Sequence, residues 1–237
     1  MSYHRFFFYL LLLLLPTQLG YHFWPEWSYV FGRRIDYLSP TVFLTDLLIL
    51  LMLSNWVIAG FRKSSYLFIG AQSLTNVQHI RHGNSIPIKL IAYLFFVIFL
   101  IINILFSLNA SVAFYKWIKL TEFVLVATYI VRTKPDKYTM LIVLAASALW
   151  SSTLAILQFS LAGSIGGPLW YLGERTFTID TPGIARVPVC PVFSAGCQLV
   201  LRPYSTFPHP NALGGYLAVI FTMLVPLSSS RTISQLQ

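Results

Sequence analysis

Long uninterrupted apolar segments constrain this chain more than any other feature of its sequence. A segment of about 20 predominantly apolar residues can cross the hydrocarbon core of a bilayer as a helix. Hydrophobic residues make up 57% of the chain and charged residues only 10%, against about 25% charged residues in soluble domains. The sequence therefore predicts an all-α polytopic membrane protein, a single membrane domain over residues 1–237 with about six transmembrane helices. These helices are expected at about 6–24, 42–61, 88–106, 112–131, 138–161 and 212–228.

The basic residues fall mostly in the gaps between the apolar segments, although the chain carries 16 Lys+Arg against 7 Asp+Glu. A nucleic-acid-binding protein clusters such residues on one face or stripe. Basic residues between membrane segments set topology and contact anionic headgroups instead. The pattern predicts membrane lipids, and no nucleic acid, as partners. The distribution of the basic residues along the chain favours a cytoplasmic N-terminus. This orientation puts the segment 162–211 on the non-cytoplasmic side.

The segment 162–211 is the longest polar connection in the chain and is rich in proline and glycine. Long connections are usually functional or disordered, and its aromatic and aliphatic content favours a functional loop. It holds both cysteines, Cys190 and Cys197. A disulfide suits an oxidising compartment, but two free buried cysteines fit the sequence equally well. Two thiols without a histidine cluster are too few ligands for a metal, so we expect neither a metal nor a cofactor.

The residues best suited to bind a ligand or to catalyse a reaction lie between Arg202 and Asn211, just before the last apolar segment. Asn211 is suited to cap a helix N-terminus, where free amides and the helix dipole favour an anion. Arg202 would add a bidentate positive charge, and His209 could transfer protons near neutral pH. These residues predict a phosphate or pyrophosphate site, with Arg186 as a further substrate-binding candidate. A purely structural reading stays open, in which Asn211 caps, Arg202 contacts lipid phosphate and His209 is an interfacial polar residue.

The run from Arg202 to Leu217, RPYSTFPHPNALGGYL, resembles the signature that opens the core region of the O-antigen ligase/polymerase superfamily. In that family an arginine, a Thr/Ser-Phe pair and a Pro-Asn precede a membrane helix. The segments Gly173–Ala185 (GERTFTIDTPGIA) and Tyr37–Asp46 (YLSPTVFLTD) also resemble bacterial members. The likeness touches most of the chain, and it implies that the chain corresponds to the N-terminal half of such a protein.

The resemblance implies a metal-independent, GT-C-like glycosyltransferase in the bacterial cytoplasmic (inner) membrane. Such enzymes transfer a glycan from an undecaprenyl-pyrophosphate carrier to a lipid or sugar acceptor during cell-surface polysaccharide synthesis. Arg202 would then hold the pyrophosphate leaving group, where charge accumulates in the transition state, and Asn211 would be a structural cap. His209 lies inside the motif without matching the family's catalytic histidine. The alternatives are a lipid-linked oligosaccharide flippase, which needs polar residues along several helices, and a non-catalytic membrane fragment.

Overall fold

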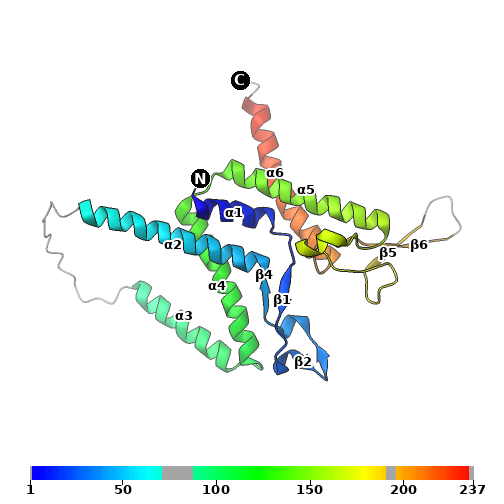
Figure 1. Ribbon diagram of the computed structural model, residues 1–237, viewed down its shortest axis with the longest axis horizontal. Coiled ribbons are helices and arrows are strands. Elements are labelled where there is room, and N and C mark those ends of the chain that lie inside the picture. Colours follow the sequence, from blue (N-terminus) through cyan, green and yellow to red (C-terminus); the bar gives the residue numbers. More distant parts are fainter. Residues whose placement is uncertain (1, 71–87, 191–195, 235–237) are drawn as a thin grey trace. The chain divides into compact units, whose positions relative to one another are not determined.

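The structure, a computed structural model, describes residues 2–70, 88–190 and 196–234, and side chains within 2–61, 94–190 and 196–225 (Figure 1). It divides into two compact units. Unit 1 comprises residues 1–21, 42–52 and 133–237, and unit 2 comprises residues 22–41 and 53–132. The α-helices are α1 (Tyr3–Leu13), α2 (Leu44–Gly70), α3 (Ile88–Leu105), α4 (Ala110–Thr133), α5 (Lys137–Leu161) and α6 (Pro210–Ser234).

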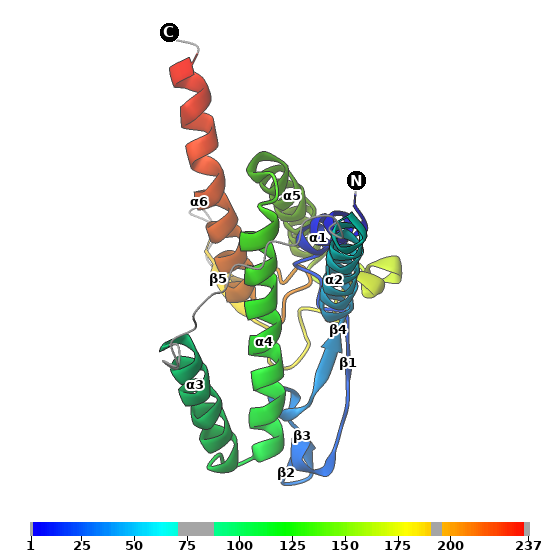
Figure 2. The same ribbon diagram turned by 90° about the vertical axis from the view of Figure 1, so that its left-hand side faces the viewer.

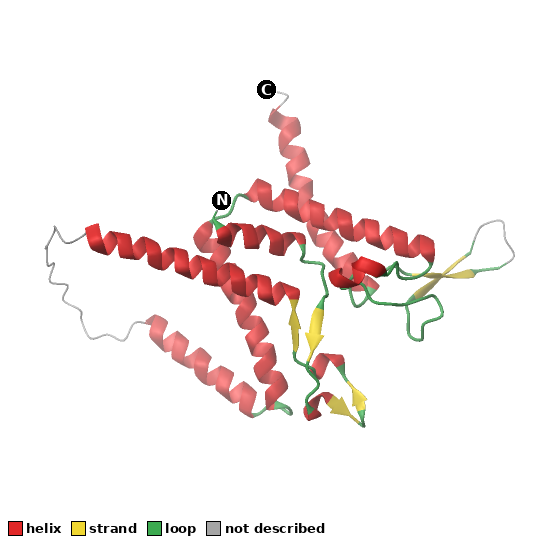
Figure 3. Cartoon of the chain, in the orientation of Figure 1, coloured by secondary structure: helices red, strands yellow, loops and turns green. Residues whose placement is uncertain are grey.

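Short strands and 3₁₀ turns occupy the connections between these helices (Figure 3). The strands are β1 (Gly20–His22), β2 (Tyr29–Val30), β3 (Arg33–Arg34), β4 (Thr41–Phe43), β5 (Arg186–Val189) and β6 (Gln198–Leu201), and the 3₁₀ turns are η1 (Glu26–Ser28), η2 (Asp36–Leu38) and η3 (Gly167–Leu172). The strands form three two-stranded sheets, in which β1 pairs with β4, β2 with β3 and β5 with β6.

This architecture corrects the prediction of an all-α, GT-C-like protein with about six transmembrane helices. The described residues combine helices with strands, and only two of their helical stretches, Leu44–Phe61 and Lys137–Leu161, are long and apolar enough to cross a membrane. The predicted helix 6–24 ends at Leu13, shortly before Pro16, and its last part forms β1. In α4, three charged residues interrupt the apolar sequence: Lys116, Lys119 and Glu122.

The core of unit 1 is built on α5, which packs against both α1 and α6 (Figures 1 and 2). The indole N–H of Trp150 donates a 3.0 Å hydrogen bond to the carbonyl of Leu13 at the end of α1. The buried hydroxyl of Ser147 forms a 2.6 Å hydrogen bond with the Tyr216 hydroxyl of α6. Burial of the apolar side chains around these contacts supplies the main favourable free energy of the packing.

The start of α5 is fixed by a local hydrogen-bonded cap. Both the backbone N–H and the hydroxyl of Thr139 donate to the Asp136 carboxylate at 2.7 Å, so a side chain satisfies an amide left free at the helix end. These bonds, first the hydroxyl and then the amide, lower the pKa of Asp136 below its ordinary value. At the other end the helix stops at Ala162, which has a left-handed backbone conformation with φ of 52°.

Unit 2 joins α3 and α4 to a small hairpin region. The indole N–H of Trp117 in α4 donates to the side-chain oxygen of Asn103 in α3 at 3.0 Å, and Phe96 and Phe99 pack edge-on against the same indole. The Tyr115 hydroxyl donates to the carbonyl of Thr41 at 3.0 Å. These contacts connect side chains that are far apart in sequence and so define the unit.

Candidate functional site

The described part of segment 162–211 folds back onto the C-terminal end of α5 around one buried polar side chain, Gln158. Its amide N–H₂ donates to Glu174 Oε1 and to the carbonyl of Ser205, both at 2.9 Å. Its amide oxygen accepts the backbone N–H groups of Tyr204, at 3.1 Å, and Ser205, at 2.7 Å. Because Gln158 is fully buried, these four bonds replace the water it would otherwise bind.

Glu174 completes this network and shapes the beginning of the segment. Its carboxylate accepts the backbone N–H groups of Ile165, at 2.8 Å, and Gly166, at 2.9 Å, besides the amide of Gln158. The side chain is only 4% exposed. A buried carboxylate needs such donors to offset its desolvation. Glu174 therefore acts as a structural anchor. The adjacent residue, Arg175, is exposed.

The helix cap at the predicted motif differs from the expectation. The first residue of α6 is Pro210, which needs no amide partner at a helix start. The residue before it, His209, accepts the backbone N–H of Asn211 on its Nδ1 atom at 3.1 Å. His209 is therefore the capping residue in place of Asn211. An accepting Nδ1 puts the proton of the neutral ring on Nε2, where it is free to donate to a ligand.

Arg202 and Asn211 are brought together, as members of one hydrogen-bonded pair. The Arg202 guanidinium donates to Asn211 Oδ1 at 2.8 Å, and the Arg202 backbone N–H donates to the carbonyl of Ala185 at 3.0 Å. This arrangement fixes one edge of the guanidinium beside the first turn of α6. The other donors of its planar fork remain available to an anion.

A small polar pocket of about 170 Å³ opens next to this helix start. Arg175 and His209 supply its charged and titratable side chains, and Tyr204 and Phe177 form part of its wall. Both aromatic rings are buried and lie 5.2 Å apart. Arg175 was not among the site residues predicted from the sequence. The available signal was its position directly after Glu174, within the proline- and glycine-rich segment 162–211.

Arg186 lies apart from this arrangement. In the β5–β6 ladder it stands opposite Leu201, whereas Arg202 follows that partner by one residue. Arg202 therefore lies just beyond the ladder that contains Arg186. Arg186 is exposed and does not line the pocket.

Cys190 and Cys197 form a disulfide at the end of the β5–β6 hairpin. Residues 191–195, between them, lie outside the described residues. We expect alkylation of the unfolded, unreduced chain to add no mass, and alkylation after reduction to add two groups. Mass spectrometry of the intact chain measures this directly. Two groups added without reduction would contradict the bond.

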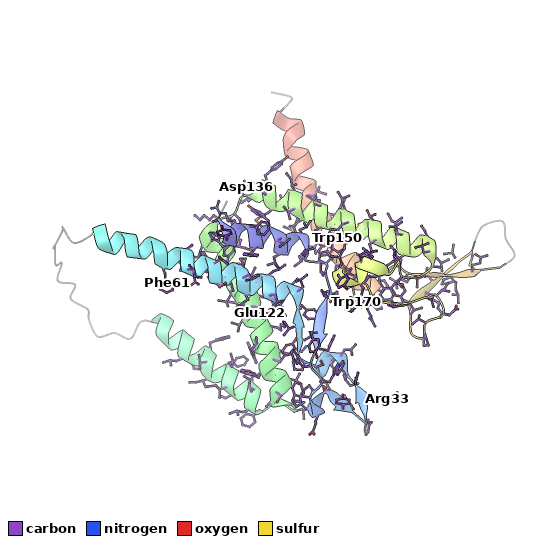
Figure 4. All side chains as sticks on the ribbon, in the orientation of Figure 1. Arg33, Phe61, Glu122, Asp136, Trp150 and Trp170 are labelled. Atoms are coloured by element: carbon purple, nitrogen blue, oxygen red, sulfur yellow. A yellow bond between two sulfur atoms is a disulfide. The ribbon has the colours of Figure 1, made fainter. Side chains whose placement is uncertain are left out.

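An apolar pocket of about 440 Å³ lies on the α1–α5 side of unit 1. Leu13, Leu14 and Trp150 line one part of it, and Leu169 and Leu172 of η3 line another. Its lining carries almost no polar surface. The exposed Trp170 of η3 lies nearby (Figure 4). This pocket suits a hydrocarbon chain rather than a charged group.

Searches find no family model, curated protein or solved structure that matches this chain at a significant level. Within the described residues, no group of three or more His, Cys, Asp or Glu side chains is placed to hold a metal ion. The site is thus defined by its own geometry: a polar pocket with an arginine and a histidine, a helix start, and an apolar pocket in the same unit.

Proposed function

We propose that this chain provides the carrier-binding part of a membrane-associated glycosyltransferase of the O-antigen ligase/polymerase type. The enzyme would transfer a glycan from undecaprenyl pyrophosphate to a lipid or sugar acceptor. The observation that carries the proposal is the polar pocket lined by Arg175 and His209 at the start of α6. The same proposal assigns the pocket to the non-cytoplasmic side of the bacterial inner membrane, with a cytoplasmic N-terminus.

The chemistry of the leaving group explains the residues. When the glycosidic bond to the carrier breaks, negative charge develops on the pyrophosphate oxygens. Arg175 and the Nε2–H of His209 would donate to those oxygens, and the positive end of the α6 dipole would add to their stabilisation. Arg202 would orient the helix start through Asn211 and offer its remaining donors to the same anion.

The position of the apolar pocket supports a lipid-linked donor. Leu172 lines the apolar pocket and Arg175 lines the polar one. The two residues are three apart in sequence, so their Cα atoms lie within about 11 Å. A ligand with an isoprenoid chain and a phosphate head needs apolar and cationic groups at this kind of separation. The volume of the apolar pocket, about 440 Å³, also falls in the range of about 300–1,000 Å³ that is typical of small-molecule sites.

Binding of undecaprenyl pyrophosphate to the purified full chain in detergent tests the proposal. We expect it to bind more tightly than undecaprenol, and Arg175→Ala to weaken pyrophosphate binding by about 10- to 100-fold because a charge-assisted hydrogen bond is lost. Arg202→Ala should have an effect of the same direction. Arg132→Gln, an exposed residue at the end of α4, is the control and should leave the affinity unchanged.

Equal affinities for undecaprenol and undecaprenyl pyrophosphate would refute the anion-binding role. Glycan transfer from carrier to acceptor in proteoliposomes then separates a transferase from a flippase. A transferase yields glycosylated acceptor, and Arg175→Ala should abolish that product while leaving the amount of folded protein unchanged. Movement of the carrier across the bilayer without any glycosylated acceptor would instead favour the flippase.

A further inference from the structure

The β2–β3 hairpin of unit 2 has an unusual tip. Tyr29 pairs with Arg34 and Val30 with Arg33, which leaves Phe31 and Gly32 as a two-residue turn. Both have positive φ values, 49° and 74°, as in the type I′ turn that matches the twist of a hairpin. Figure 2 shows the two short strands side by side.

Phe31 is a poor choice for this turn if folding alone is considered. Positive φ is unfavourable for a bulky L-residue, and Asn, Asp or Gly normally occupies the position. The Phe31 side chain is also fully exposed, so it gains no burial in return. The adjacent Val30 and Tyr29 are 42% and 37% exposed. A strained, solvent-exposed aromatic side chain indicates a role outside the fold of this unit.

The base of the hairpin is held in place by aromatic contacts. The Arg34 guanidinium lies 5.2 Å from the centre of the Trp24 ring, and the Tyr29 ring lies edge-on to Trp24 at 6.4 Å. The His22 ring also stacks on the Trp24 ring, with 5.4 Å between the ring centres. The tip is therefore presented on a supported base rather than on a free loop.

Positive charge flanks the exposed tip. Arg33 directly follows the turn (Figure 4), and its guanidinium makes no hydrogen bond, ion pair or ring contact with the described residues. Arg34 is the next residue. The nearest acidic residues in sequence, Glu26 and Asp36, belong to η1 and η2 beyond the other end of the strands. Phe31 and Arg33 thus stand together at the tip, whereas Arg34 lies at the base against Trp24.

We propose that this hairpin inserts Phe31 into the interface of an anionic lipid bilayer, with Arg33 bound to lipid phosphate. Aromatic side chains at the headgroup level and adjacent basic residues are the combination that such an interface favours. A protein partner is a weaker fit, because a stable protein interface buries about 800 Å² on each partner. A tip of one ring with one cation offers far less. The proposal uses no residue of the candidate site.

The full chain in nanodiscs containing anionic lipid, with a nitroxide label on Phe31→Cys, tests the insertion. The label is selective because the only native cysteines are joined in a disulfide. We expect the label to be more accessible to oxygen, which concentrates in hydrocarbon, than to a water-soluble nickel chelate. The exposed residue Asp36 provides the control, since a label on Asp36→Cys should show the opposite preference. Equal, water-like accessibility at both sites would overturn the proposal, as would a chain that does not associate with the nanodiscs.

Two variants separate lipid binding from folding, with the label moved to Val30→Cys. Phe31→Asn creates the Asn-Gly pair that best suits a type I′ turn, so the chain should remain folded while the label moves out into water. Arg33→Gln should lower the ratio of inserted to water-exposed label about fivefold in anionic nanodiscs, and much less in zwitterionic ones. An inserted label in the Phe31→Asn variant, or an Arg33 effect independent of lipid charge, would contradict the assigned roles.

Discussion

Replacing Gly173 by alanine is expected to detach η3 and the following residues from residues 18–19, which lie between α1 and β1. Gly173 has a φ of +90°, and an added Cβ would lie 2.5 Å from the backbone nitrogen of Leu19 and 2.6 Å from backbone atoms of Gln18. Backbone atoms cannot give way as a flexible side chain does. The steric cost adds to the roughly 1–2 kcal/mol of left-handed strain, so we expect a total loss above about 4 kcal/mol, in the exceptional range for one substitution.

A second glycine provides a matched control. Gly183 also has a positive φ, +78°, but an added Cβ there would meet no atom within 4 Å. Gly183→Ala should therefore lose only the conformational part, about 1–2 kcal/mol. Thermal unfolding in detergent and the rate of tryptic cleavage at the exposed Arg175 measure the two variants. Equal losses in both would show that Gly173 does not pack against residues 18–19.

Gln158→Leu is expected to have the second large effect, since it removes four hydrogen bonds inside unit 1. The variant would leave the backbone N–H groups of Tyr204 and Ser205 buried without their acceptor. It would also remove a donor from the buried carboxylate of Glu174. Each buried group left unsatisfied costs about 1–3 kcal/mol, so a loss of about 3–5 kcal/mol is expected for the whole network.

The same helix supplies the control for Gln158. Ser160→Ala removes one hydroxyl that is exposed and bonded only to the carbonyl of Ile156 within α5, and the change should be within about 0.5 kcal/mol of zero. Unfolding in detergent, followed by the fluorescence of the tryptophan residues, compares the variants. Gln158→Leu should also weaken binding of undecaprenyl pyrophosphate, because Tyr204 forms part of the pocket wall. A stable Gln158→Leu variant would refute the network.

The difference at the N-terminal apolar segment shows where sequence patterns mislead. Hydropathy treats residues 6–24 as one candidate helix, but the chain leaves the helix after Leu13. The Thr206 hydroxyl donates to the carbonyl of Pro16 at 2.5 Å, and the backbone N–H of Leu44 donates to the carbonyl of Leu19 at 2.9 Å. These partners lie far along the chain. A local pattern therefore could not reveal that the carbonyl groups of Pro16 and Leu19 accept hydrogen bonds from outside a helix.

The functional residues show the same division. The motif from Arg202 to Asn211 was visible as a pattern, because proline spacing, an arginine and a helix start are neighbours in sequence. Which residue caps α6 was not visible, since His209 and Asn211 are both able to accept an amide proton. The structure starts the helix at Pro210 and uses His209 as the acceptor. Arg175 joins His209 in one pocket although 34 positions separate them in the numbering.

The sequence by itself determined two apolar helical segments, expected at 42–61 and 138–161 and found at Leu44–Phe61 and Lys137–Leu161, and the structure adds that Asp136 caps the second one. Apolar composition and capping act within a few residues, so they can be read along the chain. The tertiary structure decided how the segment 162–211 folds. Gln158 forms a hydrogen bond with Ser205, 47 positions further along the chain. The pocket lined by Arg175 and His209 depends on this long-range contact. Only packing of distant residues could select those contacts, because no local preference distinguishes them from bonds to water.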